Sequence, residues 1–241
     1  FLELAASLKF LSNVDLVWHW GLLSRELFLA AWIAIFFLCG IYLLGKIRLP
    51  HDSPLESVGP LRLLSSLGCI AFCFYLLTGL FGAPLGELDA FFPPYGSQGG
   101  VAKIRTGEEL TWREDYETAL AEAQSTGRPI FIDFTGYACT NCRWMEANVF
   151  PDPEVRGLLD QYIRVQLYTD GLGEVYDRNR EFQETRFGTV ALPFYAVLSS
   201  EDREIARFPG LTRDRDLFKR FLMKGLSTDL QTSISEVRGQ R

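Results

Sequence analysis

Two long apolar runs dominate the N-terminal part of the chain. Residues 27–45 and 63–86 contain no charged side chain. Because a helix of about 20 apolar residues spans the hydrocarbon core of a bilayer, this pattern predicts transmembrane helices at 27–45 and 63–82. The same length criterion makes a pair of core helices in a soluble protein the less favoured alternative. Two such runs also fit a single cleaved signal peptide poorly.

The segment before these runs is apolar but interrupted. Residues 1–23 carry charged side chains at Glu3, Lys9 and Asp15. We interpret this segment as the end of an earlier membrane helix followed by a short outer loop. Glu3 and Lys9 either have a functional role within the membrane, or their long side chains reach its interface. The chain starts at Phe1 rather than at Met, so we expect it to be a piece of a longer protein.

Basic residues gather in the loop between the two apolar runs. Lys46, Arg48 and Arg62 flank the predicted membrane ends, and the next basic residue after the second run is Lys103. The positive-inside rule then predicts a cytoplasmic loop at 46–62 and places everything after the second helix on the opposite face. In a bacterium that face is the periplasm. We therefore expect the N-terminal part to contact the lipid of the bacterial inner membrane.

The composition changes after residue 82. We predict a membrane region at 1–82, a linker rich in Pro and Gly at 83–107, a folded domain at 108–226 and a polar tail at 227–241. The net charge of −6 and the lack of any block of Lys or Arg argue against nucleic acid as a partner.

The folded domain begins with a helical pattern. Thr111 and Glu114 form a capping box, which predicts a helix that starts at Thr111. Gly127 ends it. The predicted apolar face of this helix comprises Trp112, Tyr116, Ala119, Leu120 and Ala123.

Strand and helix patterns then alternate to the end of the domain. Asp152 and Pro153 predict an N-cap and a first helical position. Leu217, Phe218, Phe221 and Leu222 predict the apolar face of a last helix. The predicted elements are a strand at 129–135, a helix at 143–150, a helix from Asp152, a strand at 162–168, a helix at 174–186, a hairpin of strands at 194–200 and 203–210, and a helix at 212–226. This order predicts an α/β domain with a central mixed sheet flanked by helices.

Two cysteines in the segment FTGYACTNC, Cys139 and Cys142, are the main chemical candidates. A structural zinc site needs four Cys or His ligands, and the other Cys and His residues all lie in the membrane part, so no metal is expected. A structural disulfide over two residues would constrain the unfolded chain very little. A redox pair fits best, because a helix N-terminus lowers a thiol pKa from about 8.5 to about 3.5–7.5. Cys139 is then the nucleophile and Cys142 the resolving thiol.

Two motifs carry a resemblance to a known family. The segment DFTGYACTNC, in which Asp133 lies six positions before Cys139, resembles the active-site strand of thioredoxins. The segment VALPFYAVL is similar to the loop in which that family keeps a cis-proline opposite the cysteines. This resemblance implies a thioredoxin-like fold over residues 108–226, with Pro193 as the cis-proline. The usual Trp before the first cysteine is replaced by Ala138.

Asp133 has two readings. Strand alternation puts Ile132 and Phe134 on the opposite face, so the carboxylate could point to solvent. The resemblance implies instead a buried carboxylate that relays the proton of Cys142, which we favour because burial gives an acid a pKa suited to general base work.

With its membrane helices, the chain resembles the C-terminal part of the DsbD family of bacterial thiol:disulfide interchange proteins, and the likeness extends through LLGKIRLPHDSPLE. The resemblance implies an oxidoreductase without a cofactor. It also implies that an upstream membrane electron-relay domain passes electrons to the periplasmic domain, which would reduce periplasmic disulfide-containing proteins. The membrane cysteines of that family belong to earlier helices. Cys39, Cys69 and Cys73 are therefore predicted to be small apolar residues, and a redox role is the less favoured alternative.

Two other functions stay open at this point. The domain could be a dedicated reductant for cytochrome c maturation, or a non-catalytic interaction module that retains the thioredoxin fold. The direction of electron flow also stays open, because reductants and oxidants both carry a pair of cysteines at this spacing.

Overall fold

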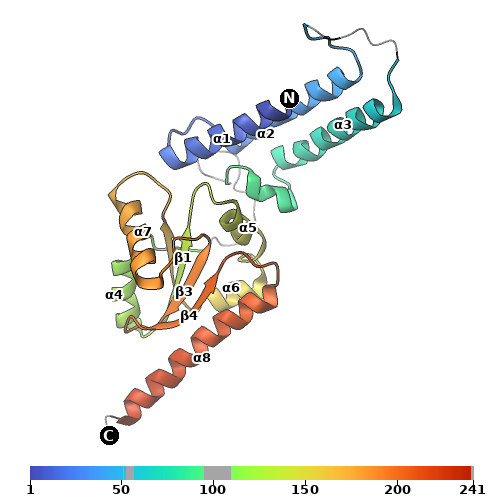
Figure 1. The fold of residues 1–241 in the computed structure, drawn as a ribbon. Helices are drawn as coiled ribbons and strands as arrows, with labels where there is room; N and C mark the ends of the chain where they lie inside the picture. Colours follow the sequence, from blue (N-terminus) through green and yellow to red (C-terminus); the bar gives the residue numbers. More distant parts are fainter. Residues whose placement is uncertain (51, 53–56, 95–109, 240–241) are drawn as a thin grey trace. The chain divides into compact units, whose positions relative to one another are not determined.

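The computed structural model describes residues 1–50, 52, 57–94 and 110–239, with backbone alone for 228–239. The chain divides into two compact units, Phe1–Thr106 and Gly107–Arg241. Figure 1 shows the elements of both units.

The first unit is helical. It contains α1 (Leu2–Trp18), α2 (Arg25–Leu43), α3 (Pro60–Leu80) and a short 3-10 helix, η1 (Gly86–Phe91). By length and composition, α2 and α3 are apolar enough to cross a membrane. They match the predicted spans at 27–45 and 63–82 to within a few residues. α1 lies where the end of an earlier membrane helix was predicted.

Part of the predicted linker at 83–107 is folded. Leu85 and Phe92 are buried in a hydrophobic cluster with Phe28 of α2. A buried ion pair between Arg25 and Asp89 supports this packing, and Asp89 also accepts a hydrogen bond from the backbone N–H of Leu85 over 2.9 Å. The prediction of a linker was therefore wrong for residues 85–92, because proline and glycine content does not reveal this tertiary ion pair. Residues 95–107 of the predicted linker lie outside the described residues.

The second unit is an α/β domain. Its elements are α4 (Tyr116–Thr126), β1 (Ile130–Thr135), α5 (Thr140–Asn148), α6 (Pro153–Leu159), β2 (Ile163–Tyr168), α7 (Glu174–Phe187), β3 (Phe194–Leu198), β4 (Glu204–Pro209) and α8 (Arg215–Gly239). The sheet order is β2-β1-β3-β4. β1 pairs parallel with β2 and antiparallel with β3, and β4 completes an antiparallel hairpin. The predicted mixed sheet is confirmed.

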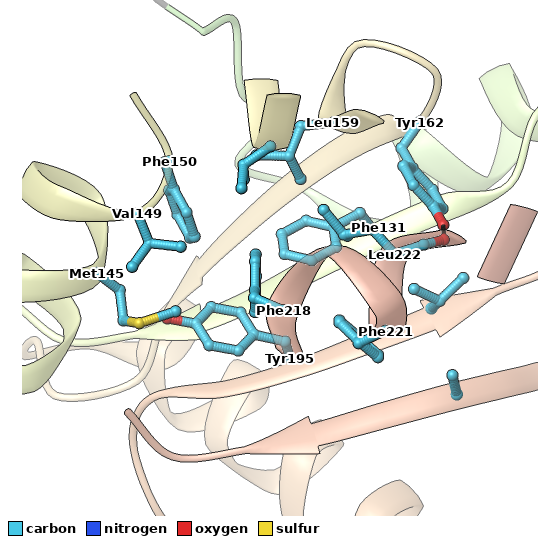
Figure 2. Close-up of a cluster of buried hydrophobic side chains, with 13 residues drawn as sticks. Phe131, Met145, Val149, Phe150, Leu159, Tyr162, Tyr195, Phe218, Phe221 and Leu222 are labelled. Carbon is cyan, nitrogen blue, oxygen red and sulfur yellow. Dashed lines mark hydrogen bonds between the residues drawn. The ribbon is translucent and has the colours of Figure 1, made fainter. Parts of the chain in front are cut away.

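Helices cover both faces of this sheet (Figure 1). One face packs against α4 and α7 around a cluster that includes Ile132, Phe134 and Phe187. The other packs against α5, α6 and α8 around Phe131 and Phe218 (Figure 2). Every residue of β1 is buried, because this strand is central and covered on both sides. Burial of each large apolar side chain contributes about 1.5–3 kcal/mol.

Short-range signals set the ends of several helices as predicted. Asp152 caps α6 by accepting hydrogen bonds from the N–H groups of Glu154 and Val155. Gly127 ends α4 in the left-handed conformation as predicted, and Gly188, just after the predicted helix at 174–186, ends α7 in the same way. Glycine adopts this conformation without steric cost.

The start of α4 differs from the prediction. Asp115, not Thr111, is the N-cap, and its carboxylate accepts from the N–H of Thr118 over 2.8 Å. Residues before it are extended, because the backbone of Arg113 pairs with β2: its N–H donates to Arg164 and its carbonyl accepts from the N–H of Gln166. The capping-box pattern was misleading because this pairing with β2 is non-local.

The last helix also differs in two ways. Phe218, Phe221 and Leu222 are buried as predicted, but Leu217 is 42% exposed and does not belong to the buried face. The backbone of α8 continues to Gly239, through most of the predicted tail at 227–241.

Candidate redox site at Cys139 and Cys142

Cys139 and Cys142 lie at the junction of the β1 loop and α5. Cys139 is the N-cap of α5, and its sulfur accepts a hydrogen bond from the N–H of Cys142 over 3.2 Å. The two sulfurs are joined in a disulfide. Cys142 is 1% exposed, whereas Cys139 is half-buried. Cys139 therefore sits at the positive end of the helix dipole, where a thiolate is stabilised.

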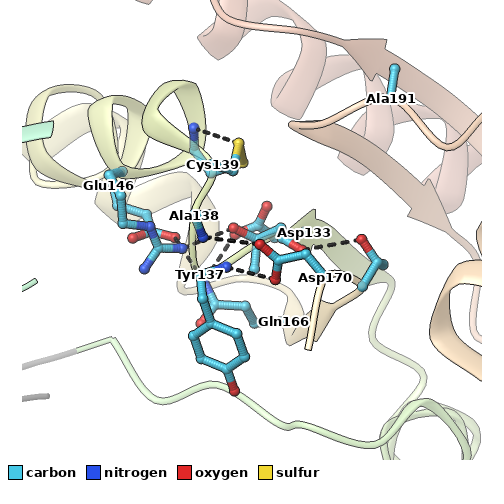
Figure 3. The surroundings of a disulfide bond; sticks show 12 residues. Asp133, Tyr137, Ala138, Cys139, Glu146, Gln166, Asp170 and Ala191 are labelled. Atoms are coloured by element: carbon cyan, nitrogen blue, oxygen red, sulfur yellow. Dashed lines mark hydrogen bonds and ion pairs between the residues drawn. A yellow bond between two sulfur atoms is a disulfide. The ribbon is translucent and has the colours of Figure 1, made fainter. Parts of the chain in front are cut away.

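Asp170, just after β2, holds the loop in front of Cys139. Its two carboxylate oxygens accept hydrogen bonds from the backbone N–H groups of Tyr137 over 2.8 Å and Ala138 over 2.9 Å. Figure 3 shows this carboxylate against the two backbone nitrogens. A Cβ atom at Gly136 would come within 2.7 Å of Asp170 Oδ2. Glycine is therefore needed for the carboxylate to approach this closely.

The ring of Tyr137 is fixed as well. It stacks on the ring of Tyr168 with centroids 4.0 Å apart, and its hydroxyl lies 3.3 Å from that of Tyr176. The backbone and the side chain of Tyr137 are thus both held by neighbouring residues. This favours a preorganised loop before Cys139.

Asp133 is buried on the face of β1 that α5 covers. It is 1% exposed, and Oδ2 accepts a hydrogen bond from Gln166 over 3.0 Å. Among the described residues, Oδ1 has no hydrogen-bond partner. Burial raises the pKa of Asp133 to about 6, against smaller lowering effects of Gln166 and Arg143. The reading that Asp133 points to solvent was wrong, because β1 is covered on both faces.

Glu146 on α5 is a second acid in this network. Glu146 Oε1 accepts hydrogen bonds from Arg143 over 2.6 Å and from Gln166 over 3.1 Å, so Gln166 bridges it to Asp133. Burial raises the pKa of Glu146 to about 7, while the charge of Arg143 opposes the shift. Both carboxyl groups therefore titrate close to neutral pH, in the range useful for proton transfer.

The sequence analysis missed Glu146, Gln166 and Asp170. Glu146 carries a detectable signal, since it follows Cys142 by four residues and so lies on the same helix face. Gln166 faces Asp133 in the parallel register of β1 and β2. Asp170 has no comparable signal, because its contact with Tyr137 spans 33 residues.

The peptide bond between Leu192 and Pro193 is cis, as the resemblance implied. The Leu192 side chain lies beside the cysteine loop, since its Cδ1 would be 3.1 Å from a Cβ at Gly136. The buried side chain of Gln183 donates a hydrogen bond to the carbonyl of Ala191 over 3.0 Å, which supports the segment before the proline. The contact of Leu192 with Gly136 brings this segment next to the loop that precedes Cys139.

Within the described part of the chain, no group of three or more His, Cys, Asp or Glu side chains could hold a metal ion. The chemistry that the described arrangement supports is thiol chemistry at Cys139 and Cys142, with Asp133 and Glu146 available for protons.

Sequence comparison relates the domain to characterised proteins. Residues 111–200 match the thioredoxin-like family. The thiol:disulfide interchange protein DsbD 1 of Pseudomonas aeruginosa is 33% identical over 109 residues, which cover 42% of this chain and 18% of that protein. DsbD of Ralstonia nicotianae is 25% identical over 154 residues, 60% of this chain and 24% of that protein. The match thus spans less than a quarter of the length of these relatives.

Solved structures with a similar fold include a thioredoxin from Thermus thermophilus, with 26% identity and a TM-score of 0.40 over 48% of this chain and 87% of that chain. Another is the oxidised C-terminal domain of DsbD from Neisseria meningitidis, with 20% identity and a TM-score of 0.38 over 48% of this chain and 99% of that domain. The sequence matches and the sheet order support one assignment. The chain is homologous to the C-terminal region of DsbD proteins, and its residues 111–200 match the thioredoxin-like family.

Proposed function

We propose that this chain is the C-terminal part of a membrane-anchored thiol:disulfide oxidoreductase that reduces periplasmic proteins. The main support is the pairing of a half-buried Cys139 at the N-terminus of α5 with a buried Cys142 one turn later. In such a pair the accessible thiolate attacks and the shielded thiol resolves.

The reaction balances without a cofactor. The thiolate of Cys139 attacks a client disulfide, forms a mixed disulfide and releases the first client thiolate. Cys142 then loses its proton and attacks the Cys139 sulfur, which releases the second client thiolate. The products are the reduced client and the Cys139–Cys142 disulfide, which is the form seen here. Two electrons have passed from the domain to the client.

In this scheme Asp133 accepts the proton of Cys142. Its carboxyl group is buried, has an oxygen without a partner among the described residues, and has a pKa raised to about 6. It is therefore mostly ionised at neutral pH and basic enough to take a proton. Pro193 contacts the client chain beside the cysteines in this scheme and takes no part in the exchange itself.

The membrane part supplies the electrons. We propose that α2 and α3 cross the bacterial inner membrane and that the loop with Lys46, Arg48 and Arg62 lies in the cytoplasm. An electron-relay domain upstream of this segment would then reduce the Cys139–Cys142 disulfide after each turnover. The relatives are named thiol:disulfide interchange proteins, which supports dithiol exchange as the chemistry of the proposal.

Trapping of client proteins tests the proposal. A Cys142→Ser variant retains a thiol that attacks but has none that resolves, so mixed disulfides should accumulate on a non-reducing gel. The matched Cys139→Ser variant should form no mixed disulfide within the thioredoxin-like domain, because Cys142, the remaining thiol there, is buried. Equal trapping by both variants would show that the two roles are assigned wrongly.

The reduction potential tests the direction of electron flow. A reductant should have a potential near that of thioredoxin, about −270 mV, rather than that of DsbA, about −120 mV. Titration of the domain against glutathione gives this value. A potential above that of protein disulfide isomerase, about −180 mV, would rule out the reductant role.

A further inference from the structure

Helices α2 and α3 bring two of the remaining cysteines together. The sulfur of Cys39 on α2 lies 3.9 Å from the sulfur of Cys69 on α3, although the residues are 30 positions apart. Both thiols are free and neither is fully buried. A disulfide needs its sulfurs about 2 Å apart, so the remaining gap of roughly 2 Å is within the reach of side-chain rotation.

The packing of the helices sets this distance. Ser66 Oγ donates a hydrogen bond to the carbonyl of Gly40 over 2.8 Å. A Cβ at Gly40 would lie 3.2 Å from Ile70 Cγ1 and 3.5 Å from Cys69 Cβ. Small residues of this kind let helix backbones approach closely. Because Gly40 follows Cys39 directly, the two helices are close together where the two thiols lie.

A second contact holds the helices in register near the loop that joins them. Arg62 on α3 donates from Nε to the carbonyl of Leu43 over 3.0 Å. Cys39 lies four residues before Leu43, which is about 6 Å along the helix at 1.5 Å per residue. The thiol pair is thus about one turn from the loop end of α2.

We propose that Cys39 and Cys69 are a second redox-active dithiol, which exchanges electrons with disulfide-bearing molecules. One thiolate attacks the incoming disulfide, forms a mixed disulfide and releases a first thiolate. The other then attacks the mixed disulfide, forms the Cys39–Cys69 bond and releases a second thiolate. Two electrons pass to the incoming disulfide, and the two thiol protons end on the released thiols. The α2–α3 contact alone supports this exchange, whether or not Cys139 and Cys142 reduce clients.

Cys73 is the natural control. It lies one turn after Cys69 on α3 and is 5% exposed. Its sulfur is 3.5 Å from the carbonyl oxygen of Ile33. We therefore expect no disulfide between Cys73 and Cys39.

The test uses the full chain in membranes with Cys139→Ser, Cys142→Ser and Cys73→Ser, so that Cys39 and Cys69 are the only thiols. The probe is 4,4′-dithiodipyridine, a small apolar disulfide. The proposal expects two pyridine-thione molecules released per chain, loss of two hydrogen atoms from the protein mass, no retained pyridyl group and a peptide that links Cys39 to Cys69. With Cys39→Ser added, Cys69 should instead keep one pyridyl group.

Other outcomes would overturn the proposal. These are a pyridyl group retained on each thiol, a link between two chains, or no reaction under conditions in which reduced Cys139 and Cys142 of the unsubstituted chain are oxidised. A second measurement guards against misfolded variants. Peptide mapping of the unsubstituted chain after the same treatment should give the Cys39–Cys69 link and no link from Cys73. A Cys39–Cys73 link would also count against it.

Discussion

At the residue scale, three acids surround the cysteine pair (Figure 3). Asp133 and Glu146 share the amide of Gln166, and burial raises the pKa of both carboxyl groups to about 6 and about 7. Asp170 acts differently, since its carboxylate holds two backbone N–H groups before Cys139. Two of these acids thus suit proton transfer, and the third positions the loop.

Asp133→Asn should slow the resolving step. An amide cannot accept the proton of Cys142, so release of the mixed disulfide should fall by about 100-fold. In the unsubstituted chain the rate of release should decrease as pH falls through about 6, where Asp133 becomes protonated. The variant should lose this inflection. Stopped-flow measurement of release from a model disulfide between pH 5 and pH 8 gives both results.

Asp177→Asn is the matched control for this experiment. Asp177 is an exposed acid on α7 that pairs with Arg180, so its loss should leave the rate and the pH profile unchanged. An Asp133→Asn profile that coincides with that of the unsubstituted chain would exclude the proton-transfer role.

Gly136 and Asp170 should be energetically coupled. Gly136→Ala places a methyl group 2.7 Å from Asp170 Oδ2, a clash that should cost about 1–3 kcal/mol. Asp170→Ala removes the clashing atoms, so Gly136→Ala should cost much less in that background. Hydrogen exchange of the β1 amides in the full chain measures the opening free energy of each variant of the cycle. Additive costs would show that the two residues are independent.

At the element scale, α8 closes the core on the face of the sheet that also packs against α5 and α6. Phe218 is fully buried among aromatic rings and stacks on Phe150 with centroids 5.9 Å apart. Tyr162 donates its hydroxyl hydrogen bond to the backbone carbonyl of Leu222 over 2.5 Å (Figure 2). Apolar burial and one satisfied polar group therefore attach the helix to the sheet.

Phe218→Ala should destabilise the domain by about 3–5 kcal/mol, since it empties a buried aromatic site. Leu217→Ala is the control in the same helix, because Leu217 is 42% exposed; its cost should stay below about 1 kcal/mol. Hydrogen exchange of β3 in the full chain should separate the two variants clearly. Similar costs at both positions would mean that the face of α8 is assigned wrongly.

At the scale of the whole molecule, the proposed route of electrons depends on membrane topology. In a chain without native cysteines, Ser57→Cys should react with an impermeant maleimide only from the cytoplasmic side. Ser97→Cys should react only from the periplasm, because Lys46, Arg48 and Arg62 hold the intervening loop inside. Ser97 lies outside the described residues, so this expectation comes from the charge pattern alone. The reverse labelling would place Cys139 in the cytosol and contradict the proposed function.

The sequence by itself determined the type and order of the helices and strands of the α/β domain and identified the cysteine pair. These features depend on neighbours within a few residues, so they can be predicted from the sequence. They are the apolar runs, the strand alternation, the Asp152 cap and the glycines that end helices. The roles expected of Cys139 and Cys142 likewise follow from their place between a strand and a helix.

Tertiary structure alone decided which polar groups meet. β1 is covered on both faces, so Asp133 is buried, where strand alternation by itself allowed exposure. Asp170 reaches Tyr137 and Ala138 because the parallel pairing of β1 and β2 brings their carboxyl ends to one edge. Packing at small residues likewise puts Cys39 beside Cys69. Such contacts join residues about 30 positions apart, and no local periodicity encodes a distance between segments that only the folded chain brings together.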